Sequence, residues 1–251
     1  MGVRLDLNPF LSAWLLGLLC CVLLFPQWVR AQAPIDPSLP EAPLPHKRAL
    51  LLLPGYDVVQ QTTNPVAPLR PGQKFEMAYR SMFDASFVVR SGIVTIFDKS
   101  LSVGPDYGRG AGGIGKLYAY NAAGLASNFF FCDGAVPALF HQDPRYFRKG
   151  SGPAKSRIWW ALRSEFIAFS DRGTSMPNYG ILAGFAVSTL LADSYLPARN
   201  VSVGKTFEGY SIKIGTNFGF NLLHEYGGVT RVRKILEKQV GKSPQPDPDL
   251  K

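Results

Sequence analysis

The sequence predicts an all-α domain, a compact bundle of about six helices. Three observations lead to this prediction. Apolar residues between Pro71 and Gln239 recur mostly at helical spacing. Proline and glycine residues fall where such helices would begin and end. Small residues also recur at every fourth position in several of the expected helices. The fold class is therefore predicted from the spacing of apolar and small residues and from the positions of proline and glycine, not from a motif.

The expected helices follow one another closely along the chain. Pro71 is suited to begin the first, and Asp84 is suited to cap the second. The first places Phe75, Tyr79 and Met82 on one face. A third helix is expected over Arg109–Phe131. The fourth should begin at Ser151 and Pro153 and have Ile158, Leu162, Phe166 and Phe169 on one side. The fifth should begin at Pro177, and the last two are expected over Lys205–Tyr226 and Val229–Val240.

Stripes of glycine, alanine and serine give these helices a way to pack. The spacing of four residues places each set on one side of a helix, where two backbones can approach closely. The stripes comprise positions 111, 115, 119, 123 and 127, then Gly180, Gly184, Ser188 and Ala192, then Ser211, Gly215 and Gly219. Both a tightly packed soluble bundle and a membrane-associated bundle use such stripes.

One segment favours a different fold. From Tyr210 to Leu222 apolar or aromatic residues alternate with glycine and polar residues, which is typical of a barrel strand. An α+β fold or a partial β-barrel around residues 207–226 is the alternative to the bundle.

The domain organisation predicted from composition has four parts. Residues 1–31 resemble a secretory signal, because an apolar run from Phe10 to Phe25 precedes small residues. This run is shorter than the ~20 residues that span a membrane. Residues 32–70 are rich in proline and are expected to form a linker, residues 71–240 the helical domain, and residues 241–251 a disordered tail.

Charge and cysteine content narrow the class of protein. The chain carries a formal charge of +9, which suits an anionic membrane surface if the chain is exported. A nucleic-acid partner is not expected, because the sequence contains no nucleic-acid motif. Beyond the signal only Cys132 remains, so no internal disulfide is expected.

The stretch LFHQDPRYFRKG contains the candidate catalytic residues His141, Asp143 and Arg145. In one interpretation His141 is a general base oriented by Asp143, and Arg145 holds an anion. In the other, which we favour, Asp143 closes the turn through backbone N–H groups and pairs with Arg145.

Cations and tryptophans follow directly and form a candidate binding surface for a membrane interface. The candidate binding residues are Arg148, Lys149, Arg157, Trp159, Trp160 and Arg163. The alternative is a solvated basic face with its tryptophans in the core. No metal site is predicted from the three histidines, and no cofactor is predicted, since GRGAGGIGK lacks the ending of a phosphate loop.

The order of YGRGAGGIGK, LFHQDPRYFRKG, a helix containing Arg163 and DSYLP resembles a group of bacterial signal-bearing proteins of unassigned function. The resemblance covers roughly Pro71 to Tyr226, and the HQDPRYF run is its most specific part. It implies a location in the bacterial envelope, in the periplasm or at the outer membrane, and implies no activity. The ending LLHEYGGV departs from the acidic-aromatic-proline ending of that group.

Two hypotheses about function follow. The first is a non-enzymatic envelope protein that associates with a membrane surface or with an envelope protein. The second is a hydrolase or lipid-modifying enzyme centred on His141. The sequence does not determine a substrate or an oligomeric state.

Overall fold

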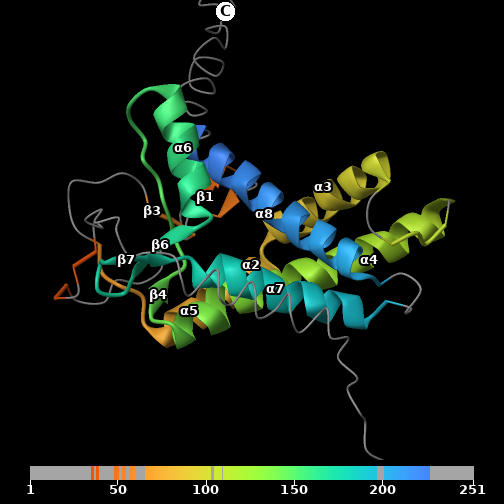
Figure 1. The fold of residues 1–251 in the computed structure, drawn as a ribbon, viewed down its shortest axis with the longest axis horizontal. Coiled ribbons are helices and arrows are strands. Elements are labelled where there is room, and N and C mark those ends of the chain that lie inside the picture. Colours follow the sequence, from red (N-terminus) through yellow and green to blue (C-terminus); the bar gives the residue numbers. More distant parts are fainter. Residues whose placement is uncertain are drawn as a thin grey trace, which may run out of the picture.

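The computed structural model describes residues 35–36, 38–39, 48–50, 53–54, 57–59, 66–102, 105–108, 110–196 and 201–226. The described chain is mostly helical with a few short strands, which confirms the predicted helical bundle (Figure 1). The expected signal, the helix over 229–240 and the tail lie outside the described residues.

The helices occupy most of the described chain. Pro71 stands at the first position of α2, and the Asp84 side chain accepts a hydrogen bond from the backbone N–H of Ser86 at the start of α3, as the sequence predicted. The helices are α2 (Pro71–Phe83), α3 (Ala85–Leu101), α4 (Gly110–Asn128), the π-helix η1 (Phe129–Ala135), α5 (Val136–Leu139), α6 (Ala154–Ser164), α7 (Tyr179–Ser194) and α8 (Val203–Tyr226).

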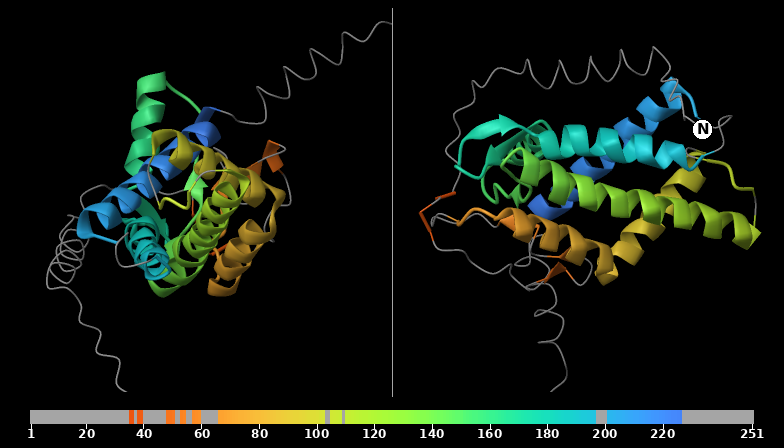
Figure 2. Two further views of the ribbon diagram at one scale, coloured as in Figure 1. Left: turned by 90° about the vertical axis from the view of Figure 1, so that its right-hand side faces the viewer. Right: turned by 90° about the horizontal axis from the view of Figure 1, so that it is seen from below.

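A long central rod organises the bundle. α4, η1 and α5 follow one another without a break, so the third expected helix continues past Phe131. α2 and α7 both contact η1, α3 contacts α4, and α8 contacts α7. In the right-hand view of Figure 2, α2 and α3 run along one edge of the molecule and α7 runs along the other side of the rod.

Short strands hold the connections between helices. They are β1 (Arg48–Leu50), β2 (Leu53–Pro54), β3 (Val58–Val59), β4 (Gln142–Asp143), β5 (Tyr146–Phe147), β6 (Ile167–Ser170) and β7 (Ser175–Pro177). β6 lies between β4 and β7 in an antiparallel sheet, while β3 pairs with β5 in parallel and β1 with β2 antiparallel. The fourth expected helix therefore ends at Ser164, and Phe169, placed on that helix by its spacing, belongs to a strand.

The folded body begins well before Pro71. Ile35 forms a bridge with Val66, and Val58 and Val59 are buried in the core, as is Leu69. Some residues of the predicted linker therefore pack against the helical domain. Their apolar side chains pack against the body because β5 provides a strand edge for Val58 and Val59.

The three small-residue stripes have different environments. In α7, Gly180, Gly184, Ser188 and Ala192 are all buried, and the positions that a Cβ of Gly180 or Gly184 would take lie against Cys132 of η1. In α4 the stripe from 111 to 127 faces outward instead, while Gly113, Leu117 and Asn121 are buried. In α8, Ser211 and Gly215 are exposed. Spacing alone identified the stripes but not the side on which each helix packs.

The alternative of a barrel strand is wrong for residues 210–222, because they lie within α8. Most of this helix is neither fully buried nor fully exposed. Its polar and apolar residues therefore do not separate clearly at helical spacing, which left the alternation of period two as the more visible pattern.

Substitutions of glycine test the contact between α7 and η1. A Cβ at Gly184 would lie 2.7 Å from the Cys132 Sγ and 3.0 Å from its Cα, so Gly184→Ala should destabilise the protein by about 1–3 kcal/mol. A Cβ at Gly215 meets nothing within 4 Å, so Gly215→Ala should stabilise it by about 0.4–1 kcal/mol. Urea denaturation of both variants measures the difference. Equal stability of the two would contradict the packing described.

Candidate functional site

Asp143 and Arg145 form a buried ion pair within their own turn. The Asp143 side chain has no exposed surface and accepts hydrogen bonds from the Arg145 backbone N–H at 3.0 Å and from Arg145 Nη2 at 2.6 Å. Arg145 Nη2 also donates to the carbonyl of Ala67 at 2.9 Å. This is the geometry that the structural interpretation of the turn predicted. The pair fixes the turn and joins it to the segment before α2.

The neighbouring Gln142 extends this anchoring to α7. Its buried side chain donates to Asn178 Oδ1 at 2.7 Å and accepts from the Gly180 backbone N–H at 3.1 Å. Asn178 caps α7 by accepting from the Ile181 N–H and donates to the carbonyl of Ser164. The turn therefore sets the start of α7 relative to the end of α6.

His141 is separated from Asp143 and Arg145. Its backbone has a positive φ of 51°, and 80% of its side chain is exposed. Its Nδ1 lies 4.0 Å from Asp171 Oδ2, and that oxygen already accepts a hydrogen bond from the buried Lys74 at 2.7 Å. The three candidate catalytic residues are thus close in sequence but do not face a common space.

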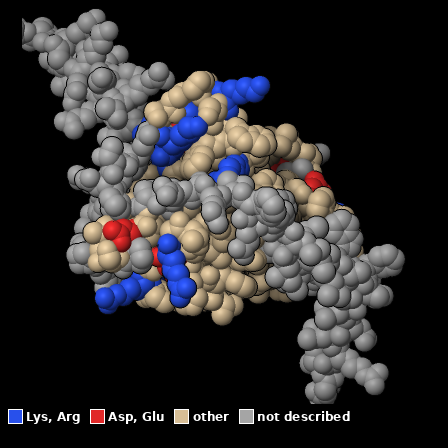
Figure 3. Space-filling view, turned by 60° about the vertical axis from the view of Figure 1, so that its left-hand side comes forward, with Lys and Arg blue, Asp and Glu red and all other residues tan. Residues whose placement is uncertain are grey.

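The candidate binding residues do not form one continuous basic surface either. Arg148 donates to the backbone carbonyl of Glu225, and Arg157 donates to its carboxylate and carbonyl. Trp160 is partly buried and donates to the Phe147 carbonyl, whereas 66% of Trp159 is exposed. On the face drawn in Figure 3, Lys and Arg side chains form separate groups with uncharged surface between them.

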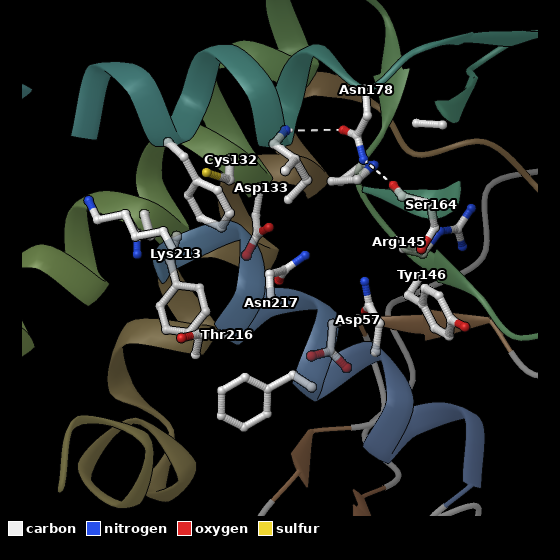
Figure 4. Close-up of a pocket in the computed structure, with 18 of the residues that line it drawn as sticks. Asp57, Cys132, Asp133, Arg145, Tyr146, Ser164, Asn178, Lys213, Thr216 and Asn217 are labelled. Carbon is white, nitrogen blue, oxygen red and sulfur yellow. Dashed lines mark hydrogen bonds between the residues drawn. The ribbon is translucent and has the colours of Figure 1, made fainter. Parts of the chain in front are cut away.

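An internal cavity of about 220 Å³ lies between the helices. Side chains from α3, α4, η1, α6, α7 and α8 line it, together with the strands around β4 and β5. Figure 4 shows Asp57, Asp133 and Asn217 pointing into it from three parts of the chain. Arg163, which the sequence analysis placed on the binding surface, lines this cavity, and its Nη2 is buried without a hydrogen bond.

Four ionisable side chains converge on one part of the cavity: Asp57, Arg90, Asp133 and His224, which we call the charged quartet. Arg90 Nη2 lies 3.7 Å and His224 Nε2 3.9 Å from Asp57 Oδ2, both longer than a hydrogen bond. Asp57 Oδ1 and Arg90 Nε are buried without any hydrogen-bond partner. In the described part of the chain no hydrogen bond joins these four side chains to one another.

The surroundings of the quartet shift the protonation of two members. Burial and, to a smaller extent, the charge of Asp57 raise the pKa of Asp133 to about 8, against the opposing effect of Arg90. Burial lowers the pKa of His224, against the attraction of Asp57. Asp133 is therefore mostly protonated and His224 mostly neutral at pH 7.

Two further ionisable groups lie beside the cavity. Burial raises the pKa of Glu165 to about 7, although Asn217 and Asn221 donate hydrogen bonds to its carboxylate. Burial also lowers the pKa of Lys213 to about 8, and its Nζ donates to Ser188 at 3.0 Å. A cluster of such shifted groups is typical of a functional site, although structural networks shift pKa values too.

The fold and this site define a helical bundle with a cavity that both apolar and ionisable side chains line. Comparisons with family models, with curated proteins and with solved structures found no match to this chain. Among the described residues no group of three His, Cys, Asp or Glu side chains is arranged to hold a metal ion. The site is therefore interpreted from its own geometry.

Sequence reasoning missed the charged quartet, because its members are far apart in the chain and match no motif. A signal was present for two of them. Arg90 lies within FVVRSGIV and Asp133 within FFFCDGAV, so each charge is surrounded by apolar residues. A lone charge in an apolar helical segment is costly to bury and indicates a polar interior.

Substitutions in the turn test its structural role. Asp143→Ala leaves the buried Arg145 guanidinium without its carboxylate and should cost about 3–5 kcal/mol. His141→Ala alters an exposed side chain and should cost about 0.5 kcal/mol or less. Arg145→Lys keeps the charge but loses the forked contact, so an intermediate loss is expected. Thermal melts rank the variants, with the exposed Arg172→Ala as control. A melt of Asp143→Ala equal to the parent would contradict this role.

The raised pKa of Asp133 predicts a pH dependence of stability. Above pH 6.5 and below about 8, folded Asp133 keeps a proton that the unfolded chain releases, so raising the pH favours unfolding. The raised pKa of Glu165 also makes the stability of the fold decrease as the pH rises, up to about pH 7. The melting temperature should fall across this window, and it should fall less in Asp133→Asn. Glu208→Gln, at an exposed position on α8, should keep the parental slope. If Asp133→Asn leaves the slope of melting temperature against pH unchanged, Asp133 is not the cause of this pH dependence.

Proposed function

We propose that this chain is an exported envelope protein that attaches peripherally to an anionic membrane surface through the apolar outer face of α2 and α3. The observation that carries the proposal is the inverted distribution of residues on α3. This helix buries Ser86, Arg90, Ser91, Thr95 and Asp98.

The outer side of α3 is apolar. Ile96, Phe97 and Leu101 are each more than 60% exposed, and Val88 and Ile93 are also exposed. A helix of a protein in water buries its apolar face and exposes its polar one. On α3 the polar face is instead directed into the bundle, where Asn121 donates to Asp98 at 2.9 Å and to Thr95 at 3.3 Å.

α2 also has apolar residues on its outer side. Phe75, Tyr79 and Phe83 follow one another at four-residue spacing and are all exposed. Tyr79 and Phe83 contact each other with ring centroids 4.6 Å apart. Phe75 and Tyr79, which their spacing predicts on one face of the helix, are both directed outward. Large apolar side chains exposed in such number on two consecutive helices mark an interaction site.

Several observations favour a lipid surface as the partner. Within the described residues no helix is both long and apolar enough to cross a membrane, so attachment at the surface is the mode proposed. The net charge of +9 favours anionic lipids. The signal-like segment and the resemblance to bacterial envelope proteins support export to the periplasm or the outer membrane.

Vesicle sedimentation tests the proposal. The purified full-length protein should sediment with vesicles of phosphatidylglycerol and phosphatidylethanolamine, and less with phosphatidylcholine alone. Ile96→Gln combined with Phe97→Gln should weaken binding about tenfold or more, because each side chain contributes apolar area buried in lipid. Leu139→Gln, exposed at the end of α5, is the matched control and should bind like the parent.

Two outcomes would overturn the proposal: no sedimentation of the parent, or unchanged binding of the α3 double variant. Trp159→Gln tests the alternative surface around α6. If this variant loses more vesicle binding than the α3 double variant, the membrane contact lies at the tryptophans instead. Cell fractionation of the tagged full-length protein checks the location independently, with recovery in the cytoplasmic fraction counting against export.

A further inference from the structure

The charged quartet has no part in membrane attachment by α2 and α3. Its side chains line the internal cavity, while the proposed lipid contact is on the outer surface. Arg90 illustrates the separation, because it belongs to α3 but its side chain is only 10% exposed. Membrane attachment therefore does not account for these four ionisable side chains.

The quartet contains buried hydrogen-bonding groups without partners in the described chain. Asp57 is held in place by its backbone, whose carbonyl accepts from the Tyr146 N–H at 2.9 Å. Its carboxylate nevertheless leaves Oδ1 without a partner, and the 3.7 Å and 3.9 Å separations to Arg90 and His224 leave those contacts too long for hydrogen bonds. Buried polar groups are normally hydrogen-bonded, and a ligand could supply the missing partners.

The charge of the quartet limits the ligand. One carboxylate, Asp57, lies beside one guanidinium, Arg90, and the two charges compensate each other. Asp133 and His224 are mostly neutral at pH 7. An ionic ligand would disturb this balance in a region of low dielectric, which costs free energy. An uncharged ligand keeps the balance.

The chemistry of the groups defines the ligand further. Asp57 accepts hydrogen bonds, Arg90 donates them, and His224 and a protonated Asp133 can each do both. Neighbouring hydroxyl groups match such a mixture, since each hydroxyl donates one bond and accepts others. Aromatic rings supply an apolar wall, with the Phe220 centroid 4.5 Å and the Phe129 centroid 5.8 Å from the Arg90 guanidinium.

We propose that this cavity binds a small uncharged polyol, of the size of a single sugar ring, through Asp57, Arg90, Asp133 and His224. The hydroxyl groups take up the unpaired donors and acceptors of the quartet. The carbon face of the ring lies against Phe129 and Phe220. A cavity of about 220 Å³ is suited to one such ring rather than to an oligosaccharide.

Isothermal titration calorimetry on the full-length protein, in a detergent without a sugar head group, tests the proposal. The probes are glucose, N-acetylglucosamine and myo-inositol. Cyclohexanol, which has the carbon ring of myo-inositol with one hydroxyl, is the matched control. At least one polyol should bind at millimolar concentration or below, and cyclohexanol should not. Asp57→Asn should weaken polyol binding about tenfold or more, because a site built for hydrogen bonds is sensitive to the loss of one partner.

A second pair of variants tests the cavity without changing the quartet. Val94 lines the cavity one helical turn after Arg90, so Val94→Phe should occupy the space and abolish binding. Val187→Phe, the same exchange at an exposed position of α7, should bind like the parent. Circular dichroism confirms that both variants fold. Absence of binding for all three polyols, equal binding of cyclohexanol, or retention of binding in folded Val94→Phe would overturn the proposal.

Discussion

The buried carboxylate of Glu225 joins the end of α8 to β5 and α6, and the other elements depend on this junction. It accepts hydrogen bonds from Tyr146, from the backbone of Lys149 and Gly150, and from Arg157. Burial alone would raise its pKa, but these donors together lower the pKa below its ordinary value. The last turn of α8 is thus fixed to β5 and α6, and His224, the preceding residue, is fixed at the cavity.

This anchoring explains how a bundle with a polar interior remains folded. The apolar clusters of the core are small, for example Leu69 with Met77, so packing is supplemented by ion pairs between largely buried side chains. Lys74 with Asp171 and Asp143 with Arg145 connect α2, the turn and the sheet. Forming such pairs costs desolvation energy, but removing one partner leaves a buried charge uncompensated and is strongly destabilising.

The sequence predicted the helices more reliably than their surroundings. Pro71 and Asp84 act through local geometry, so the beginnings of α2 and α3 could be inferred from them. Which side of a helix faces the core is decided by contacts distant in sequence, and the outward stripe of α4 and outward face of α3 could not be inferred from spacing. The structural role of Asp143 followed from local turn chemistry, whereas the quartet required the positions of four separate segments.

The π-helix η1 also limits where residues can be inserted into or deleted from the chain. A π-helix corresponds to an α-helix with an inserted residue, and such insertions are frequently found at functional sites. Removing one residue between Phe129 and Ala135 would allow a regular α-helix, but would turn α4 by about 100° relative to α5. Cys132 and Asp133 would then no longer face α7 and the cavity together. Insertions and deletions are therefore much less tolerable here than amino-acid exchanges, and related chains should keep the same number of residues in this turn.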